Sequence, residues 1–228
     1  MAMNDESHGH GHSHGHDHPH NHNHPHDPIE VKDGAGEYEI MVHAIKELLI
    51  EKDVLWPDQI RKAIEFMDSR TPALGAKVVG RAWSDHEYKK RLLEDGTAAV
   101  AELGIGRGDA ELIVVENTEG THNVVVCTLC SCYPRTVLGL PPDWYKSRNY
   151  RSRVVVEPRA VLREFGTVVP DDVTVRVHDS NADMRYLVLP MRPMGTEGWS
   201  EAKLAALVTR DCMVGVAVPK LDETVPAE

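Results

Sequence analysis

The sequence predicts an α/β (α+β) fold, in which a helical N-terminal arm precedes a mixed, layered α/β domain with largely antiparallel strand pairs. Two patterns along the chain lead to this prediction. Over residues 37–104, apolar residues recur at helical spacing, and from Glu111 onward short β-rich runs alternate with turn-forming residues. The predicted boundaries are therefore 37–104 for the helical region and 105–228 for the α/β domain.

Residues 1–28 form a low-complexity segment, in which histidine occupies every even position from His8 to His26. Small and polar residues fill the other positions, so the segment cannot bury apolar surface and is predicted to be a disordered tail. Imidazoles at this density suit loose binding of divalent metal ions. A cloning tag or a tail without function is the alternative interpretation.

The composition and the lack of long apolar runs argue against nucleic acids and membranes as binding partners. The 228 residues carry 25 basic and 36 acidic side chains, a net charge of -11 with histidine neutral. Such an acidic chain, without a basic run, is predicted not to bind nucleic acid. The N-terminal residues lack the cationic start and apolar stretch of an export signal, and no apolar run is long enough to span a bilayer. We therefore expect a soluble cytoplasmic protein that does not contact a membrane.

Helical spacing from Glu37 predicts a first helix, and Pro57 can open a second at its first position, where the missing N–H of proline costs nothing. Ser84 followed by Glu87 predicts a capping box at the start of a helix that stops at Gly96. Further short helices are predicted over 74–83 and 97–103. Their apolar stripes would pack either on the rest of the chain or on a partner subunit.

The α/β region contains two predicted strand pairs. Residues 111–116 and 122–127 are β-rich runs joined by a turn-like link, and 173–178 with 185–190 form the second pair. A helix opened by proline and closed by glycine is predicted over 158–166, and Ser200 is predicted to cap another. Residues 212–218 are predicted to form a last strand.

Cysteines point to metal chemistry. Cys127, Cys130 and Cys132 fall within six residues, whereas a disulfide framework would spread its cysteines to join distant segments. A closed zinc site or an iron–sulfur cluster needs four ligands at characteristic spacings, and Cys212 is the one spare cysteine. A structural metal site is therefore the weaker interpretation.

The step Cys130-Ser131-Cys132 allows another arrangement. If the amides of Ser131 and Cys132 lost their protons, their nitrogens and the sulfurs of Cys130 and Cys132 could surround one ion, with Cys127 as an axial ligand. A sixth position would stay open for substrate or water. Amide deprotonation requires a strongly Lewis-acidic trivalent ion, and the spacing alone does not establish it.

The string Val-Cys-Thr-Leu-Cys-Ser-Cys at 126–132 resembles the metal-binding motif of the nitrile hydratase α subunit. The resemblance extends over Tyr38–Pro219. It includes Leu-Gly-Leu-Pro-Pro-Asp-Trp-Tyr-Lys at 138–146, Tyr-Arg-Ser-Arg-Val at 150–154, Gly-Thr-Glu-Gly-Trp at 195–199 and Val-Thr-Arg-Asp-Cys at 208–212.

The resemblance implies a low-spin trivalent metal in a claw of Cys127, Cys130, Ser131 and Cys132. Thr128, where iron enzymes of the family tend to carry serine, favours non-corrin Co(III) over Fe(III). It also implies that Cys127 stays a thiolate while Cys130 becomes a sulfinic acid and Cys132 a sulfenic acid, two successive states of cysteine oxidation. Residues 105–228 would then be the metal-binding catalytic domain.

The resemblance further implies a β subunit, whose arginines bind the oxidised sulfurs, and an activator protein that inserts the metal. The implied catalytic residues are Cys132, Cys130 and Arg185, which aligns with a family arginine near the metal. The implied reaction hydrates a nitrile to an amide. Either the metal polarises the nitrile or activates water, or the Cys132 sulfenate attacks the nitrile carbon.

Arg135 and Thr136 depart from the family pattern, which has tryptophan and proline there. Arg135 would line the substrate pocket and make it more polar and more positive. Arginine at this place also resembles thiocyanate hydrolase, a relative that converts thiocyanate to carbonyl sulfide and ammonia. Nitrile hydration is the preferred prediction, and thiocyanate hydrolysis and a cobalt-carrier protein are the alternatives.

Other polar residues have simpler interpretations. His122 and His178 are predicted to be satisfied core or surface histidines rather than catalysts. Arg151 and Arg153 could brace the cysteine loop or a partner's carboxylate, or could simply face solvent. Cys212 is predicted to be a small buried residue rather than a ligand.

Overall fold

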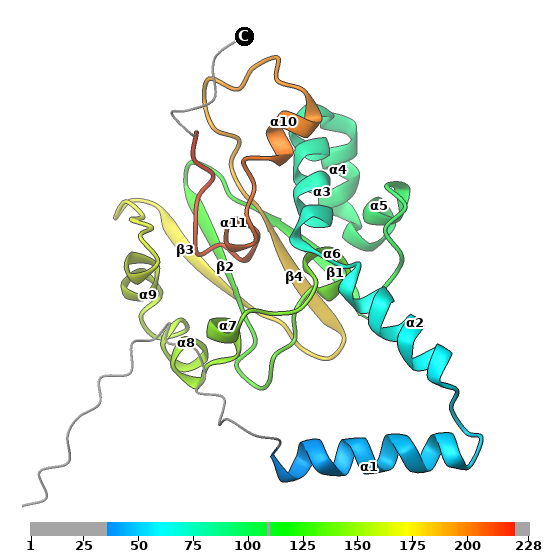
Figure 1. Ribbon diagram of the computed structural model, residues 1–228. Helices are drawn as coiled ribbons and strands as arrows, with labels where there is room; N and C mark the ends of the chain where they lie inside the picture. The colour runs from blue at the N-terminus through cyan, green and yellow to red at the C-terminus, as the bar shows by residue number, and fades with distance from the viewer. Residues whose placement is uncertain (1–35, 109, 222–228) are drawn as a thin grey trace, which may run out of the picture.

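The computed structural model describes residues 36–108 and 110–221, so the His-rich tail predicted over 1–28 lies outside the described residues. Two N-terminal helices, α1 (Glu37–Glu51) and α2 (Pro57–Asp68), form an arm that leads away from the strands (Figure 1). Pro57 opens α2 as predicted, and the side chain of Gln59 accepts a hydrogen bond from the backbone N–H of Trp56 at 2.9 Å. No residue of α1 or α2 is buried.

Three helices that follow the arm pack together beside the strands: α3 (Pro72–Ser84), α4 (His86–Glu94) and α5 (Gly96–Glu102). The predicted cap of α4 was wrong by one residue. Asp85 accepts from the N–H of Tyr88 at 3.0 Å, while the Ser84 hydroxyl donates back to the carbonyl of Gly80 within α3. Aspartate is as good a cap as serine, and the chain uses the one that lies outside the preceding helix.

Gly96 does not simply end a helix, as predicted, but begins α5, which Asp95 caps. A Cβ atom at this position would lie 2.4 Å from the carbonyl oxygen of Leu112. The glycine therefore lets α5 approach the first strand more closely than any other residue would.

The four strands are β1 (Glu111–Glu116), β2 (Thr121–Val126), β3 (Thr174–Asp179) and β4 (Met184–Leu189). The predicted antiparallel pairing was wrong. β1 pairs in parallel with β4, and β2 pairs in parallel with β3, so each short link carries the chain from one two-stranded sheet to the other. Strands adjacent in sequence therefore do not pair with each other, and β2 packs against β4 across the two sheets.

Burial explains this arrangement. The residues of β2 from His122 to Val126 are all buried, as is usual for parallel strands that are covered on both faces. Only a single bridge, Thr118 with Thr121, forms in the link where a hairpin was predicted. The nearly continuous burial of β2 and the three buried residues at the end of β4 favour two covered sheets over hairpins with one face in water.

Short helices occupy the rest of the chain. α6 (Arg135–Leu138), α7 (Asp143–Lys146) and α8 (Arg148–Arg153) follow the cysteine loop and were not predicted. α9 (Pro158–Glu164) and α10 (Glu201–Ala205), which Ser200 caps, lie where helices were predicted. The strand predicted over 212–218 was wrong: α11 (Arg210–Val214) forms there, capped by Thr209 and ended by Gly215 in the left-handed conformation.

Among the described residues, no helix has both the length and the apolar character needed to cross a lipid bilayer.

Candidate metal centre

The three clustered cysteines lie in the loop that leaves β2. Cys127 follows the last residue of the strand and is fully buried, while Cys130 is exposed. The sulfur of Cys130 lies 3.5 Å from that of Cys127 and 3.3 Å from that of Cys132. The backbone N–H of Cys130 also donates to the sulfur of Cys127 at 3.2 Å, so the loop is folded around its own sulfur atoms.

Asp179, the last residue of β3, anchors the start of this loop. Its carboxylate accepts from the backbone N–H of Thr128 at 2.9 Å and from the Thr128 hydroxyl at 2.5 Å. The parallel register places Asp179 beside Val126, one residue before Cys127. The sheet pairing therefore brings the carboxylate to the loop.

Two further side chains hold the end of the loop. Arg151 in α8 donates to the carbonyl of Cys130 at 3.0 Å, and Tyr145 in α7 donates to the carbonyl of Cys132 at 2.8 Å. Arg151 thus braces the loop, one of the alternatives that the sequence left open. Arg153 instead forms ion pairs with Glu157 and Glu164.

The pKa values of the Cys130 and Cys132 thiols are shifted in opposite directions. Hydrogen bonds with Cys132 and Cys127 lower the pKa of the Cys130 thiol to about 7. Burial and the hydrogen bond with Cys130 raise the pKa of the Cys132 thiol to about 12, against the opposing influence of the Arg185 guanidinium. Thiols this close cannot easily all lose their protons, because the negative charges on adjacent sulfurs would repel one another. A bound cation would offset that repulsion and let all of them deprotonate.

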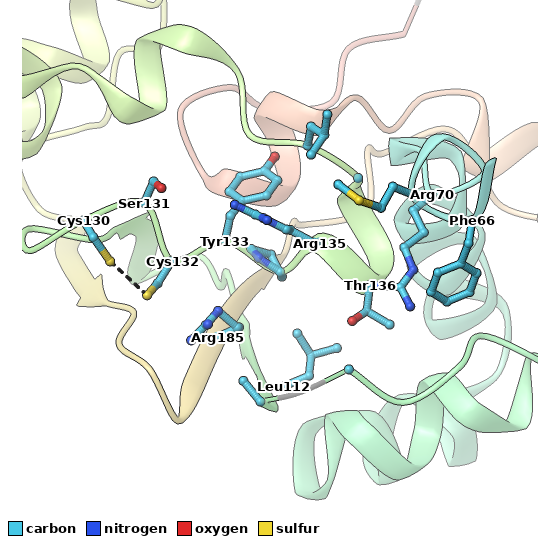
Figure 2. Close-up of a pocket in the computed structure, with 16 residues that line it drawn as sticks. Phe66, Arg70, Leu112, Cys130, Ser131, Cys132, Tyr133, Arg135, Thr136 and Arg185 are labelled. Carbon is cyan, nitrogen blue, oxygen red and sulfur yellow. Dashed lines mark hydrogen bonds between the residues drawn. The ribbon is translucent and has the colours of Figure 1, made fainter. Parts of the chain in front are cut away.

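The cluster opens onto a pocket of about 520 Å³ (Figure 2). Of the residues predicted for the site, Cys130, Ser131, Cys132, Arg135 and Arg185 all line this pocket. Cys127 is buried and is not among the lining residues.

Several residues around the site were not predicted. Asp179 and Tyr145 hold the loop, and Phe66, Met67 and Arg70 reach the pocket from the end of α2 and the link after it. Asp179 follows the predicted strand over 173–178, and the cysteines begin at the end of the predicted strand over 122–127. A prediction that these two strands pair in parallel would have placed Asp179 beside the cysteines. No local pattern connects Arg70 with the cysteines, because the two segments are more than fifty residues apart.

The remaining candidates take structural roles. The His122 ring lies 2.8 Å from the carbonyl of Gly215, and the His178 ring lies 2.9 Å from the side-chain oxygen of Asn123. Burial lowers the pKa of both histidines, which favours their neutral form. Cys212 is buried in α11 beside Thr209, apart from the other cysteines.

The donor set fits a soft or borderline transition metal. The sulfurs of Cys127, Cys130 and Cys132 all lie within 4.8 Å of one another, and thiolate ligands select such ions. Within residues 36–108 and 110–221, this is the one group of three or more cysteine, histidine or acidic side chains close enough to share an ion.

Comparison with known proteins agrees with this site. The profile of the family described as "Nitrile hydratase, alpha chain" matches residues 36–217. The cobalt-containing nitrile hydratase subunit alpha of Pseudonocardia thermophila is 54% identical over 187 residues, which cover 81% of this chain and 92% of that protein. Thiocyanate hydrolase subunit gamma of Thiobacillus thioparus is 43% identical over 213 residues and 88% of each chain.

A solved structure of recombinant thiocyanate hydrolase with partially modified cobalt centres superposes with a TM-score of 0.77 at 41% identity, covering 85% of this chain and all of that one. The match of the family profile over residues 36–217 and the identity to its curated members lead to one conclusion. This chain belongs to the nitrile hydratase α-chain family.

Proposed function

We propose that this chain is the α subunit of a cobalt nitrile hydratase, which adds water to a nitrile and releases the amide. The observation that carries the proposal is the cluster of Cys127, Cys130 and Cys132, two of which line a pocket together with Arg135 and Arg185. Curated relatives that are named as cobalt-containing nitrile hydratase α subunits support it.

The three cysteine sulfurs, with the backbone nitrogens of Ser131 and Cys132, would hold the metal. When bound, Co(III) would supply Lewis acidity to the pocket. We further propose that Cys130 matures to the sulfinic acid and Cys132 to the sulfenic acid. Both side chains reach the pocket surface, where an oxidant has access to them.

Cys132 is the proposed reactive residue of the chain. As a sulfenate, its oxygen would either remove a proton from the attacking water or attack the nitrile carbon itself. In either route the carbon–nitrogen triple bond gains one oxygen at carbon and two protons at nitrogen, which are the atoms of one water. Arg185, whose positive charge opposes the rise in the Cys132 pKa, would stabilise negative charge on that sulfur group.

A β subunit would complete the site. The family assignment as an α chain implies this partner, and the apolar residues of α1 and α2 are exposed in the structure. We propose that arginines of the β subunit pair with the oxidised sulfurs and that a separate activator protein inserts the metal.

Thiocyanate hydrolysis is the second candidate, because Arg135 makes the pocket more positive than tryptophan would and a relative with that activity is 43% identical.

The test is to measure metal content, the mass of the peptide that spans Cys127–Cys132, and turnover of the purified complex. Cobalt, three added oxygens and amide formed from a nitrile would support the proposal. Consumption of thiocyanate without amide formation would favour the relative's reaction, and zinc with unmodified cysteines in the active complex would refute the oxidised claw.

A further inference from the structure

Among the described residues, the charged side chains that line the pocket beside the cysteines are all positive, in a chain whose net charge is -11. Arg70, Arg135 and Arg185 all line it. Among the described residues, which exclude 109, no aspartate or glutamate lines the pocket or forms an ion pair with any of these three arginines. Each guanidinium carries five N–H donors, so the pocket presents many donors that no described carboxylate pairs with.

The charges are distributed along the pocket. Figure 2 shows Cys130 and Cys132 at one end, Arg70 and Phe66 at the other, and Arg135 between them. The guanidinium of Arg70 lies 4.1 Å from the centre of the Phe66 ring, a cation–π contact that holds it at the pocket wall. Arg185 lies nearer the cysteine end, where its charge acts on Cys132.

The space and its walls suit a ligand larger than a cyano group. The volume of about 520 Å³ falls in the range of about 300–1,000 Å³ that is typical of small-molecule sites. Apolar side chains line it together with the arginines: Phe66, Met67, Leu112 and Leu140. A ligand that fills the pocket would therefore have an apolar body with a polar group at each end.

We propose that the preferred substrates are nitriles that carry a carboxylate, with an apolar and preferably aromatic body between the two groups. The inference rests on the proposed function, because the cyano group would lie at the cysteine end. The carboxylate would lie against Arg135 and Arg70, since guanidinium binds carboxylate through paired, charge-assisted hydrogen bonds. A neutral nitrile would leave these guanidiniums unpaired, and a cationic one would be repelled.

The experiment compares three substrates of nearly the same shape on the metal-loaded complex with the β subunit. These are 4-cyanobenzoate, 4-cyanobenzamide and 4-cyanobenzylamine, which are anionic, neutral and cationic near neutral pH. We expect kcat/KM to be about tenfold or more higher for the acid than for the amide, the factor that one charged hydrogen bond gives. The amine should be the poorest of the three.

Variants then assign the preference to residues. Arg70→Gln and Arg135→Gln should each lower the acid-to-amide ratio of kcat/KM by about tenfold or more. Arg70→Lys, which keeps the charge, should retain most of the ratio and so separates lost charge from altered packing. Arg163→Gln, at an exposed arginine of α9 outside this pocket, is the matched control and should leave the ratio as it is.

The outcomes separate this inference from the proposed function. Equal turnover of acid and amide, or a preference for the amide, overturns the anionic substrate class while nitrile hydration stands. Preservation of the ratio in both glutamine variants overturns the assignment to Arg70 and Arg135. If the metal-loaded complex hydrates none of the three nitriles and consumes thiocyanate, the proposed function fails and this inference fails with it.

Discussion

Substitution of the loop cysteines should show which sulfurs the metal needs. Cys130→Ser and Cys132→Ser remove sulfurs that lie 3.3 Å apart, and we expect either change to abolish metal retention or turnover. Hydroxyl oxygen is a poorer ligand than thiolate for a soft or borderline ion. Cobalt content after gel filtration and amide formation are the measurements.

Cys212→Ser is the control for these variants, because Cys212 is a buried cysteine of α11 outside the cluster. Its cobalt content should match that of the unchanged protein. Full activity in Cys130→Ser or Cys132→Ser would refute the claw.

Asp179 acts on the site through Thr128 and not by contact with the sulfurs. Asp179→Asn keeps the shape but removes the negative charge that accepts both hydrogen bonds from Thr128. Loss of a residue that supports metal ligands typically weakens metal affinity by about 10-fold to 100-fold, so we expect faster loss of cobalt to a chelator. Asp183→Asn, in the exposed link between β3 and β4, is the matched control. Equal rates in the two variants would show that the Thr128 contact does not hold the loop.

At the scale of elements, the sequence located the strands but not their partners. The runs over 111–116 and 173–178 are nearly the observed β1 and β3. A short turn-like link suggests a hairpin. The same number of residues can instead carry the chain from one sheet to the other, as the link between β1 and β2 does. Only the burial of both faces of β2 distinguishes a hairpin from such a crossing. The local sequence pattern indicates whether a segment forms a strand, whereas the pairing of that strand depends on which parts of the chain pack against its faces.

The strand predicted over 212–218 fails for a related reason. The apolar residues from Cys212 to Val216 are buried, which suits a strand as well as a buried helix. Thr209 as a cap and Gly215 as a left-handed terminator are the local signals that favour α11, and both lie at the ends of the run and not within it.

Gly215 gives a test of this interpretation. Its φ is 90°, and a Cβ atom there would lie 2.0 Å from the carbonyl oxygen of Asn123 in β2. Gly215→Ala should therefore destabilise the fold by more than the cost of about 1–3 kcal/mol for an unfavourable backbone conformation alone. Gly166→Ala is the control, since Gly166 has a φ of 80° but no atom within 4 Å of the added carbon. Thermal unfolding compares the two variants, and equal losses would show that the close approach to β2 is not rigid.

His122 connects β2 to the residue that ends α11, through its contact with the carbonyl of Gly215. Burial lowers the pKa of His122 below its usual value of 6.5, so the unfolded chain takes up the proton first as pH falls. The resulting stability is complete above about pH 6.5 and is lost as pH falls towards the lower pKa of the folded state. The pKa of His178, which is half-buried and lies near Arg176, is lowered by burial and by that positive charge, so it acts in the same direction.

We therefore expect the melting temperature of the complex to fall between pH 7 and pH 5.5, and to fall less steeply in His122→Gln. His86→Gln, at a residue that begins α4, is the control. A melting temperature that rises as the pH falls through this range would contradict the assignment.

For the molecule as a whole, the sequence predicted the part of the site that is local. Cys127, Cys130 and Cys132 fall within six residues of one loop, and their sulfurs lie within 4.8 Å of one another. Arg135 and Arg185 line one pocket with Cys130 and Cys132, and their roles in substrate binding and catalysis stay predictions. Arg70, Asp179 and Tyr145 come from other parts of the chain: the link after α2, the end of β3 and α7.

The arm is the largest part of the described structure that has no core of its own. Tyr38, Val42 and Ile45 of α1 are between 54% and 80% exposed. The sequence left open whether these apolar residues cover the rest of the chain or a partner, and the structure shows that no described part of this chain covers them. An apolar surface of this kind marks a protein interface, and the family assignment implies a β subunit.

Val42→Lys and Ile45→Lys should therefore weaken assembly with the β subunit, by about tenfold or more for each residue that lies at the centre of the interface. The fold of the α subunit itself should persist, because no residue of α1 is buried in it. Glu51→Lys, at an exposed polar position of the same helix, adds the same positive group without removing an apolar one. Sedimentation of the mixed subunits measures the affinity, and circular dichroism of the α subunit checks its folding. If both lysine variants assemble as tightly as the control, the β subunit does not cover this face of α1.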